Sequence, residues 1–310
     1  MRAPSPDTAT SLTLASLLDQ VPVLSGPRTV EPLPGGLTNH NFKVTTSAAS
    51  YVARISSQDT ELLSIDRNAE YRNSRIAGLA GIAPEVADVL LDKGVLVVDW
   101  VEGTTCHAED LDDPRTLAQL ARLCRSLHSG ERFVSNFDMF DVQRNYLAIV
   151  TERGFRLPPR YLDFMQSVAR MRQALAVRAE PVVPCHNDLL AENLIDDGHR
   201  LWLIDFEYSG NNDAYFELGN IVSESNLSVD QLEYLLSHYG DRVERNKIAR
   251  ALLLATMAKY GWTLWASIQC GISELDFDFW SWGMQRYERA VAEFGSPDFD
   301  RLLDEVTAMD

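Results

Sequence analysis

The sequence predicts an α+β protein with two lobes, a small lobe rich in β-strands and a larger, mainly helical lobe. Its 310 residues, 45% of them hydrophobic, can bury a large core. Short runs with strand-like alternation fill residues 29–101, whereas helical periodicity dominates after residue 113. We therefore expect one domain over residues 1–100 and a second over residues 101–310, joined near residues 99–103.

The small lobe is predicted to hold a sheet and one helix. Three segments carry β-branched residues bounded by Gly, Pro and Asp, namely 29–46, 50–56 and 85–101. Residues 64–80 instead have helical spacing, and Gly81 and Pro84 predict where that helix ends. The apolar positions of this helix are Ile65, Ala69, Ile76 and Leu79.

The large lobe is predicted to be helical with one interruption. A helix over residues 113–130 opens on Asp113 as its cap and on Pro114 in its first turn. Residues 182–210 break the helical pattern, and the sequence there indicates a strand, a turn at "DDGH" and a second strand. Polar residues that could carry chemistry gather in this interruption.

Composition restricts the class of partner. The formal net charge of −17 argues against nucleic acid as a partner, because binding to phosphates depends on basic residues.

The most apolar stretch, residues 251–272, contains Lys259, which favours a buried helix over a membrane span. Four cysteines lie far apart, and the first 24 residues lack the features of a signal peptide. We expect a cytoplasmic protein. The sequence does not decide its oligomeric state, and a homodimer is one possibility.

Three oxygen-bearing side chains in residues 182–210 point to phosphoryl transfer. That reaction needs a carboxylate to orient the incoming hydroxyl and oxygen ligands for the magnesium ion that bridges the phosphates. Asp188 is the candidate for the first task, and Asn193 and Asp205 are the candidate ligands of Mg²⁺, which prefers oxygen. A lone aspartate at a strand end is usually a cap, so the prediction depends on all three together.

The segments "PCHNDLLAENLI" and "LWLIDFEYSGNNDAYFELGN" resemble the choline and ethanolamine kinase family. That family lies in the aminoglycoside-phosphotransferase-like group, so the resemblance implies a protein-kinase-like fold. The pattern matches the kinase signature except at Asn187, where the signature has arginine, and at Glu207, where it has glycine. The resemblance runs from about Leu33 to the C-terminal helices. It implies a nucleotide-binding lobe at 1–100, a catalytic and substrate-binding lobe at 101–310, and a bracing role for His186.

Glycines in the first lobe suggest a phosphate-binding turn. Gly35 and Gly36 stand between two predicted strands, where backbone amides can approach phosphates, and Thr38 and Asn39 could add donors. A Gly-Gly turn of this kind is more often an ordinary hairpin. Arg54 stands where the wider kinase fold has a lysine that contacts phosphates, so the resemblance gives it that role.

The resemblance also implies an ion-pair partner for Arg54 and a site for adenine. Glu70 is the expected partner, and Asp66, one turn earlier, is the rival carboxylate. Backbone groups from Asp99 to Val101 would hold adenine at the join between the lobes.

Aromatic residues after the motif suggest how an acceptor would bind. Aromatic faces with nearby carboxylates recognise a quaternary ammonium group. By resemblance, the residues lining the acceptor site are Tyr208, Glu224, Trp262, Trp265 and Trp282. Core packing is the alternative for tryptophans spaced along one helix. Trp280 and Tyr287 remain alternatives to Trp282.

The predicted function is an ATP- and Mg²⁺-dependent kinase of a small molecule, phosphorylating the hydroxyl of choline. Ethanolamine, thiamine or an aminoglycoside are alternative acceptors, and an inactive nucleotide-binding module is the alternative from another class. The sequence leaves open the role of Glu207 and whether residues 104–113 form a lid.

Overall fold

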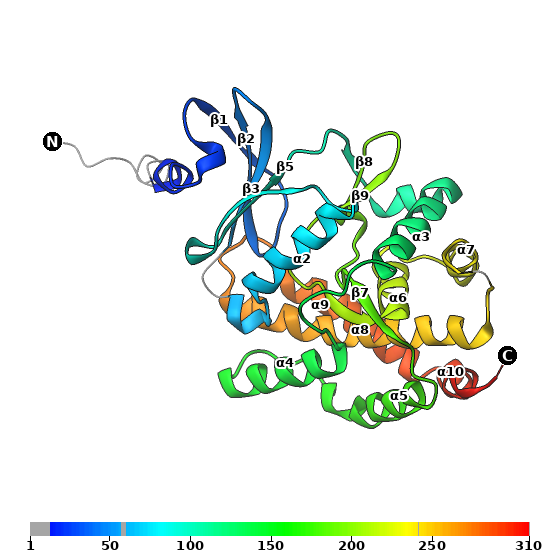
Figure 1. Ribbon diagram of the computed structural model, residues 1–310. Helices are drawn as coiled ribbons and strands as arrows, with labels where there is room; N and C mark the ends of the chain where they lie inside the picture. Colours follow the sequence, from blue (N-terminus) through cyan, green and yellow to red (C-terminus); the bar gives the residue numbers. More distant parts are fainter. Residues whose placement is uncertain (1–12, 57–59, 241, 310) are drawn as a thin grey trace.

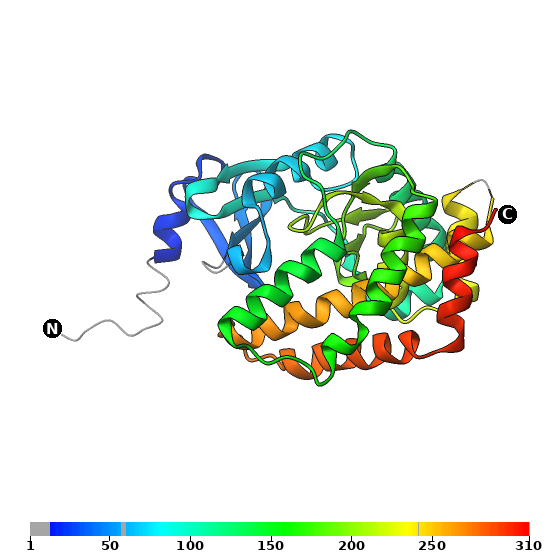
Figure 2. The same ribbon diagram turned by 90° about the horizontal axis from the view of Figure 1, so that it is seen from below.

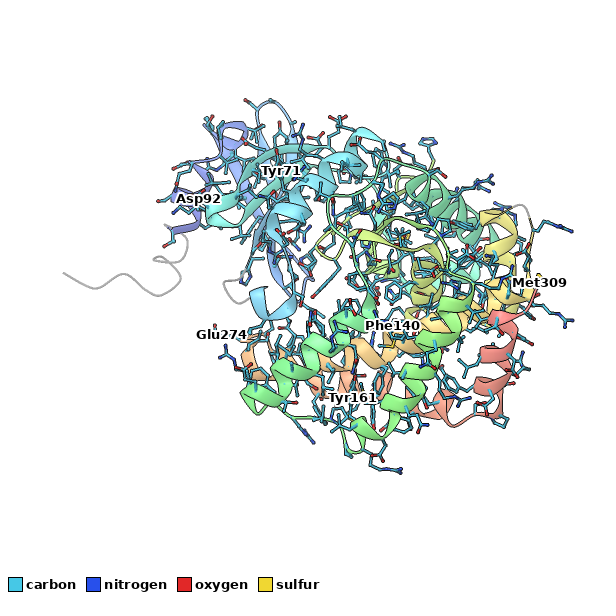
Figure 3. The ribbon with its side chains drawn as sticks, turned by 60° about the horizontal axis from the view of Figure 1, so that its bottom comes forward. Tyr71, Asp92, Phe140, Tyr161, Glu274 and Met309 are labelled. Atoms are coloured by element: carbon cyan, nitrogen blue, oxygen red, sulfur yellow. The ribbon has the colours of Figure 1, made fainter. Side chains whose placement is uncertain are left out.

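The computed structural model describes residues 13–56, 60–240 and 242–309. Figure 1 shows the strands of the first hundred residues gathered on one side and most of the helices on the other. Figure 3 labels Tyr71 and Asp92 in the first of these parts and Phe140 and Tyr161 in the second. The molecule thus has the predicted two lobes.

The small lobe contains a five-stranded antiparallel sheet. Its strands, in spatial order, are β1 (Arg28–Leu33), β2 (Asn39–Thr46), β3 (Ser50–Ser56), β5 (Val95–Asp99) and β4 (Val86–Leu90). Strand β3 lies at the centre, where Arg54 is opposite Asn41 of β2 and Leu96 of β5. One face buries Val44, Ala53 and Val97. The three segments predicted as strands therefore form this sheet.

Helix α2 (Arg67–Leu79) is the helix predicted in the small lobe. Asp66 caps it by accepting hydrogen bonds from the backbone N–H groups of Asn68 and Ala69. The helix ends just before Gly81, as the sequence predicted. Unlike a helix that only covers a sheet, it buries the polar residues Glu70 and Asn73. This polar face indicates that α2 takes part in a charged network.

The large lobe is built around helix α8 (Arg245–Ile272). The other helices are α3 (Pro114–His128), α4 (Met139–Arg153), α5 (Met165–Val177), α6 (Ala214–Glu224), α7 (Val229–Tyr239), α9 (Phe279–Phe294) and α10 (Pro297–Thr307). Helices α4, α6, α9 and α10 all pack on α8, and Figure 2 shows it running through this lobe. A helix covered on all sides needs no polar face, which explains why α8 is mostly apolar from residue 251 onward.

None of the described helices is long and apolar enough to cross a membrane.

Two small sheets complete the large lobe. Strand β8 (Leu194–Asp196) forms a hairpin with β9 (Leu201–Leu203), which confirms the predicted turn, and β6 (Thr104–Thr105) pairs with the other edge of β8. Strand β7 (Val182–Cys185) pairs instead with β10 (Gly210–Asp213). The segment before the turn is therefore two strands separated by a loop, rather than the single strand predicted.

The sequence left open whether residues 104–113 form a lid, and in the structure this segment packs into the large lobe. Thr104 and Thr105 belong to β6, and a 3-10 helix follows over Ala108–Asp112. Cys106 and Leu111 are buried in the same apolar cluster as Leu194 and Leu203. This burial fixes the segment against the β8–β9 hairpin.

Candidate active site

A pocket of about 870 Å³ lies between the two lobes. The sheet lobe contributes Gly35, Thr38 and Arg54 to its wall, and the join contributes Val98 to Val101. From the large lobe come the residues Asp188, Asn193, Asp205, Tyr208, Glu224, Trp262, Trp265, Trp282 and Arg286. The structure thus brings most of the predicted site residues to one cavity.

The β8–β9 hairpin brings the three chemically important side chains together. Asp188 lies in the loop after β7, Asn193 ends the short 3-10 helix Ala191–Asn193, and Asp205 follows β9. The backbone N–H of Ile204 donates to the carbonyl of Asn193 at 3.0 Å, which holds the two chain ends side by side. Asn193 and Asp205 are twelve positions apart in the sequence, yet both line one pocket.

The donor atoms of this group fit a hard cation. The side-chain amide of Asn193 donates to the backbone carbonyl of Asp188 at 2.8 Å, so its oxygen is the atom directed elsewhere. Asp205 has a left-handed backbone, with φ of 69°. Strain of this kind collects at functional sites, where the surrounding structure maintains it. The amide oxygen of Asn193 and the carboxylate of Asp205 are oxygen ligands of the type that Mg²⁺ takes.

Negative charge is concentrated around Asp188. Burial and the nearby carboxylates of Asp205, Glu207 and Glu224 raise the pKa of Asp188 well above its usual range, and Arg286 opposes this effect. Carboxylates crowded in this way favour the approach of cations. The pocket therefore has the electrostatic character of a site for a metal ion and a cationic ligand.

Arg54 is the main positive charge among these acids. Its Nη1 lies 3.1 Å from Glu70 Oε1, its Nη2 forms an ion pair with Asp205, and Glu207 lies 3.9 Å away. The pKa of Arg54 is raised because these three carboxylates outweigh the cost of burial. Of the two rival carboxylates at α2, Glu70 is therefore the one that pairs with Arg54, whereas Asp66 caps the helix. Glu70 stands behind Arg54, outside the pocket lining.

The glycine turn has the backbone that its residues predict. Gly35 and Gly36 both have φ of 87°, and a Cβ on Gly36 would come within 2.9 Å of the carbonyl oxygen of Asn39. Only glycine adopts this conformation without strain. Both glycines line the pocket near Arg54.

Thr38 and Asn39 bond to a residue whose role the sequence left open. Thr38 Oγ1 and Asn39 Nδ2 both donate to the carboxylate of Glu207, at 2.9 Å each. Arg67 of α2 also donates to Glu207, at 3.2 Å. Burial and the charge of Asp205 raise the pKa of Glu207 to about 7. Glu207 thus links the glycine turn and α2 to the segment after β9 that carries Asp205.

Asn187 braces the loop that presents Asp188. Its amide donates to the carbonyls of Tyr208 and Gly210 at 3.0 and 3.1 Å, and its oxygen accepts from Asn212 at 2.9 Å. Its backbone N–H donates to Glu217 at 2.8 Å. The residue that departs from the kinase signature therefore has a structural role of its own. Sequence reasoning missed it because its partners come from separate segments.

Two histidines support the same loop. His186 bonds through Nε2 to the carbonyl of Ile204 at 2.7 Å, in agreement with its expected bracing role. His128 Nε2 lies 3.1 Å from Glu217. Although burial alone would raise it, the hydrogen bond and charge of His128 lower the pKa of Glu217. Glu217 is fully buried among these groups and supports the loop from α6.

Four aromatic residues, Tyr208, Trp262, Trp265 and Trp282, form an aromatic wall of the pocket. Trp265 Nε1 donates to the hydroxyl of Tyr208 at 2.9 Å, and the Tyr208 ring meets Trp262 edge to face at 5.0 Å between centroids. Trp282 lies 5.3 Å from Trp265 by the same measure. The alternatives to Trp282 are placed elsewhere, because Trp280 stacks under Arg156 and Tyr287 packs on Tyr161.

Glu224 has a partner that the sequence analysis did not consider. Arg286 of α9 forms a two-pronged ion pair with its carboxylate, and the Arg286 guanidinium lies 3.3 Å from the centroid of Trp282. The sequence carried a signal only for the contact with Trp282, because Arg286 follows Trp282 by four residues and therefore lies on the same helix face.

The join between the lobes offers an apolar slot. Val52, Leu96 and Val98 line it from the sheet and Leu203 from the hairpin. The backbone N–H of Asp99 donates to the backbone carbonyl of Glu85 at 2.9 Å. The predicted residues Asp99 and Val101 both border this slot.

Comparisons with known proteins point to one family. A family model described as choline/ethanolamine kinase matches residues 30–247. Protein LicA of Haemophilus influenzae is 30% identical over 221 residues, which are 68% of this chain and 62% of that protein. This chain therefore aligns with less than two thirds of that relative. Ethanolamine kinase 2 of Homo sapiens is 27% identical over 267 residues, which are 77% of this chain and 68% of that protein.

A solved structure extends the likeness to the whole fold. The crystal structure of a choline/ethanolamine kinase family protein from Mesorhizobium loti is 30% identical and has a TM-score of 0.82, with 96% of this chain and 99% of that chain covered. The predicted fold class, two-lobed, α+β and protein-kinase-like, is therefore confirmed.

Proposed function

The chain belongs to the choline/ethanolamine kinase family, and from that premise we propose that it transfers the terminal phosphoryl group of ATP to the hydroxyl of choline. The observation that carries this proposal is one pocket lined by three kinds of group. Asp188, Asn193 and Asp205, the glycine turn with Arg54, and the aromatic wall all border it. A phosphate donor and a cationic alcohol can therefore meet at Asp188.

The nucleotide would bind across the join. The apolar slot between Val98 and Leu203 would enclose adenine, with the backbone of Asp99 and Val101 as its polar partners. The phosphates would extend toward Gly35, Gly36 and Arg54. Thr38 lines the pocket and could turn from Glu207 to the phosphates, whereas Asn39, also bonded to Glu207, lies outside the pocket lining.

The residues of the acid group have distinct roles in this proposal. The carboxylate of Asp188 would accept a hydrogen bond from the acceptor hydroxyl and aim its oxygen at the phosphorus. Asn193 and Asp205 would hold Mg²⁺, which supplies positive charge to the phosphate oxygens when it is bound. Arg54 would exchange part of its contact with Asp205 for the phosphates. Preorganised charge of this kind is the main source of catalysis in phosphoryl transfer.

The aromatic wall favours choline among the acceptors. A quaternary ammonium has no N–H to donate, so it gains most from the faces of Tyr208, Trp262, Trp265 and Trp282. Ethanolamine would fit the same wall and could also donate to Glu224. An aminoglycoside needs many polar partners, and thiamine needs a slot for two rings. Ethanolamine is therefore the main alternative acceptor.

An inactive nucleotide-binding module is disfavoured by the complete set of reactive groups. Asp188, Asn193, Asp205 and Arg54 are all present and all line the pocket. No one of them is replaced by an apolar residue.

The test is an ATP-consumption assay with Mg²⁺ over choline, ethanolamine, thiamine and an aminoglycoside. We expect turnover with choline, at a kcat/KM about tenfold or more above that for ethanolamine, roughly the 1–2 kcal/mol that a desolvated cation–π contact contributes. Chelation of Mg²⁺ should abolish turnover. Nucleotide binding without turnover of any acceptor would contradict the proposal and favour the inactive module.

A further inference from the structure

Arg286 places a positive charge beside the aromatic wall, where the acceptor is proposed to bind. Its Nε lies 3.2 Å from Glu224 Oε1, and its Nη2 bonds to Glu224 Oε2, so the two groups meet as a fork on a carboxylate. Its guanidinium lies 3.3 Å from the centroid of Trp282, and its Nη1 donates to the Trp282 carbonyl at 3.3 Å. Both Arg286 and Glu224 line the pocket.

This arrangement uses the groups that an acceptor cation needs. A ligand ammonium is recognised by an aromatic face and a nearby carboxylate, and Trp282 and Glu224 provide these groups. The Glu224 side chain is only 5% exposed and that of Arg286 14% exposed, so the pair is largely removed from water. A two-pronged pair of this kind is stronger than a point contact. With Arg286 in place, Glu224 contributes little net attraction for a second cation.

We propose that Arg286 is a resident cation of the acceptor site, which the ammonium group of the acceptor displaces from Glu224 and Trp282. The inference rests on the proposed function for the nature of the acceptor. Arg286 can leave because it lines the pocket from helix α9, so its side chain has cavity space into which it can turn. In the absence of acceptor it prevents Glu224 from being a buried, unpaired charge, which would be costly.

Displacement lowers the affinity for every acceptor cation. The apparent dissociation constant equals the intrinsic one divided by the fraction of molecules whose site is competent. If Arg286 leaves Glu224 in about one molecule in ten, its removal strengthens apparent binding about tenfold. The effect should concern the acceptor alone, because the contacts described for Arg286 are with Glu224 and Trp282 and not with the groups proposed to hold the nucleotide.

The experiment measures binding of tetramethylammonium by titration calorimetry. This probe carries the quaternary charge but no hydroxyl, so its binding does not require phosphoryl transfer. The variant Arg286→Met keeps the length of the side chain and removes its charge. We expect it to bind the probe about tenfold more tightly than the unaltered protein. Weaker or unchanged binding by a folded Arg286→Met would overturn the inference.

Arg289→Met is the matched control. Arg289 lies on the same helix with similar partial exposure, and it donates to the backbone carbonyl of Ser223, next to Glu224, at 3.0 Å. Its removal should leave probe binding within about twofold. A tightening equal to that of Arg286→Met would show a general effect of lost positive charge and would overturn the inference.

A second variant protects the test against misfolding. Arg286→Lys keeps a cation but cannot form the fork, so it should bind the probe about threefold more tightly, between the unaltered protein and Arg286→Met. Adding Glu224→Gln to Arg286→Met should remove the gain, because the freed carboxylate is its source. A gain that survives Glu224→Gln would contradict the assignment.

The two proposals fail in different ways. If no amino alcohol is phosphorylated while Arg286→Met still tightens probe binding, the proposed function fails and the resident cation stands. If choline is phosphorylated but Arg286→Met lowers neither the KM for choline nor the dissociation constant of the probe, the resident cation alone is refuted. A selective fall in the KM for choline, with the KM for ATP unchanged, supports both.

Discussion

Asn187 and Asp205 both hold a left-handed backbone, with φ of 68° and 69°. Asparagine and aspartate tolerate this region better than most residues do, at some cost in energy. At Asn187 the side-chain bonds offset that cost, and the turn that results directs Asp188 into the pocket. The left-handed residue at one aspartate is Asn187, which directly precedes Asp188. At the other it is Asp205 itself.

Asn187→Ala should destabilise the protein strongly. It removes the side chain that bonds Tyr208, Gly210 and Asn212 in a buried place and leaves their groups unpaired, which costs about 2–4 kcal/mol in the free energy of unfolding. The measurement is urea denaturation. Asn226→Ala is the matched control, because Asn226 also has positive φ, 54°, but is exposed, so about 1 kcal/mol is expected. Equal losses would show that only backbone strain matters at Asn187.

The turn between β1 and β2 connects to both lobes. Gly35 and Gly36 shape it, and Glu207 receives hydrogen bonds from Thr38 and Asn39 at its end. Glu207 belongs to the segment after β9, so these bonds cross from one lobe to the other. A change in the shape of the turn should therefore be felt first by a ligand between the lobes.

Gly36→Ala should weaken nucleotide binding more than acceptor binding. The new Cβ would approach the Asn39 carbonyl to 2.9 Å while φ is 87°, so the turn must move. We expect the KM for ATP to rise about tenfold, with the KM for the acceptor within about twofold, equivalent to about 1.4 kcal/mol at the turn. Gly26→Ala is the control, since Gly26 has φ of 89° with open space around it. A similar change in that variant would contradict a special role for Gly36.

Helices α3 and α6 meet the loop that carries Asn187 and Asp188 through Glu217. Because interaction with His128 lowers the folded-state pKa of Glu217, folding favours its ionised form. The resulting stabilisation is fully present above the ordinary pKa of 4.5 and is lost as the pH falls through the lower folded-state value.

Glu217→Gln should therefore lose stability only where the carboxylate is charged. We expect a loss of about 1–3 kcal/mol at pH 7 that shrinks progressively below about pH 4.5. Urea denaturation at several pH values measures it, with Glu233→Gln, an exposed glutamate on α7, as the control. A loss that stays constant down to pH 3 would show that shape rather than charge is responsible.

For the whole molecule, the sequence predicted the two lobes, the hairpin and the approach of Asp188, Asn193 and Asp205. These features depend on local periodicity and on a turn that returns the chain over a short distance. The bonds from Thr38 to Glu207 and from Arg286 to Glu224 were not predicted. They join residues 169 and 62 positions apart, and no local pattern specifies such pairs.

Charge is organised on the same scale. The formal net charge is −17, and several carboxylates converge on the pocket while Arg54, Arg67 and Arg286 are paired among them. Each of these arginines is paired with a carboxylate whose side chain is only 5% exposed. The protein's own cations thus offset part of the negative charge around the pocket.

The most direct test of the central claim is a comparison of Asp188→Asn with the unaltered protein in the ATP-consumption assay with choline. If Asp188 orients the hydroxyl in a pocket that other residues build, kcat should fall by about 10³ or more, while the dissociation constant for ATP changes less than about threefold. Turnover that persists within about tenfold of the original rate in Asp188→Asn would contradict the account.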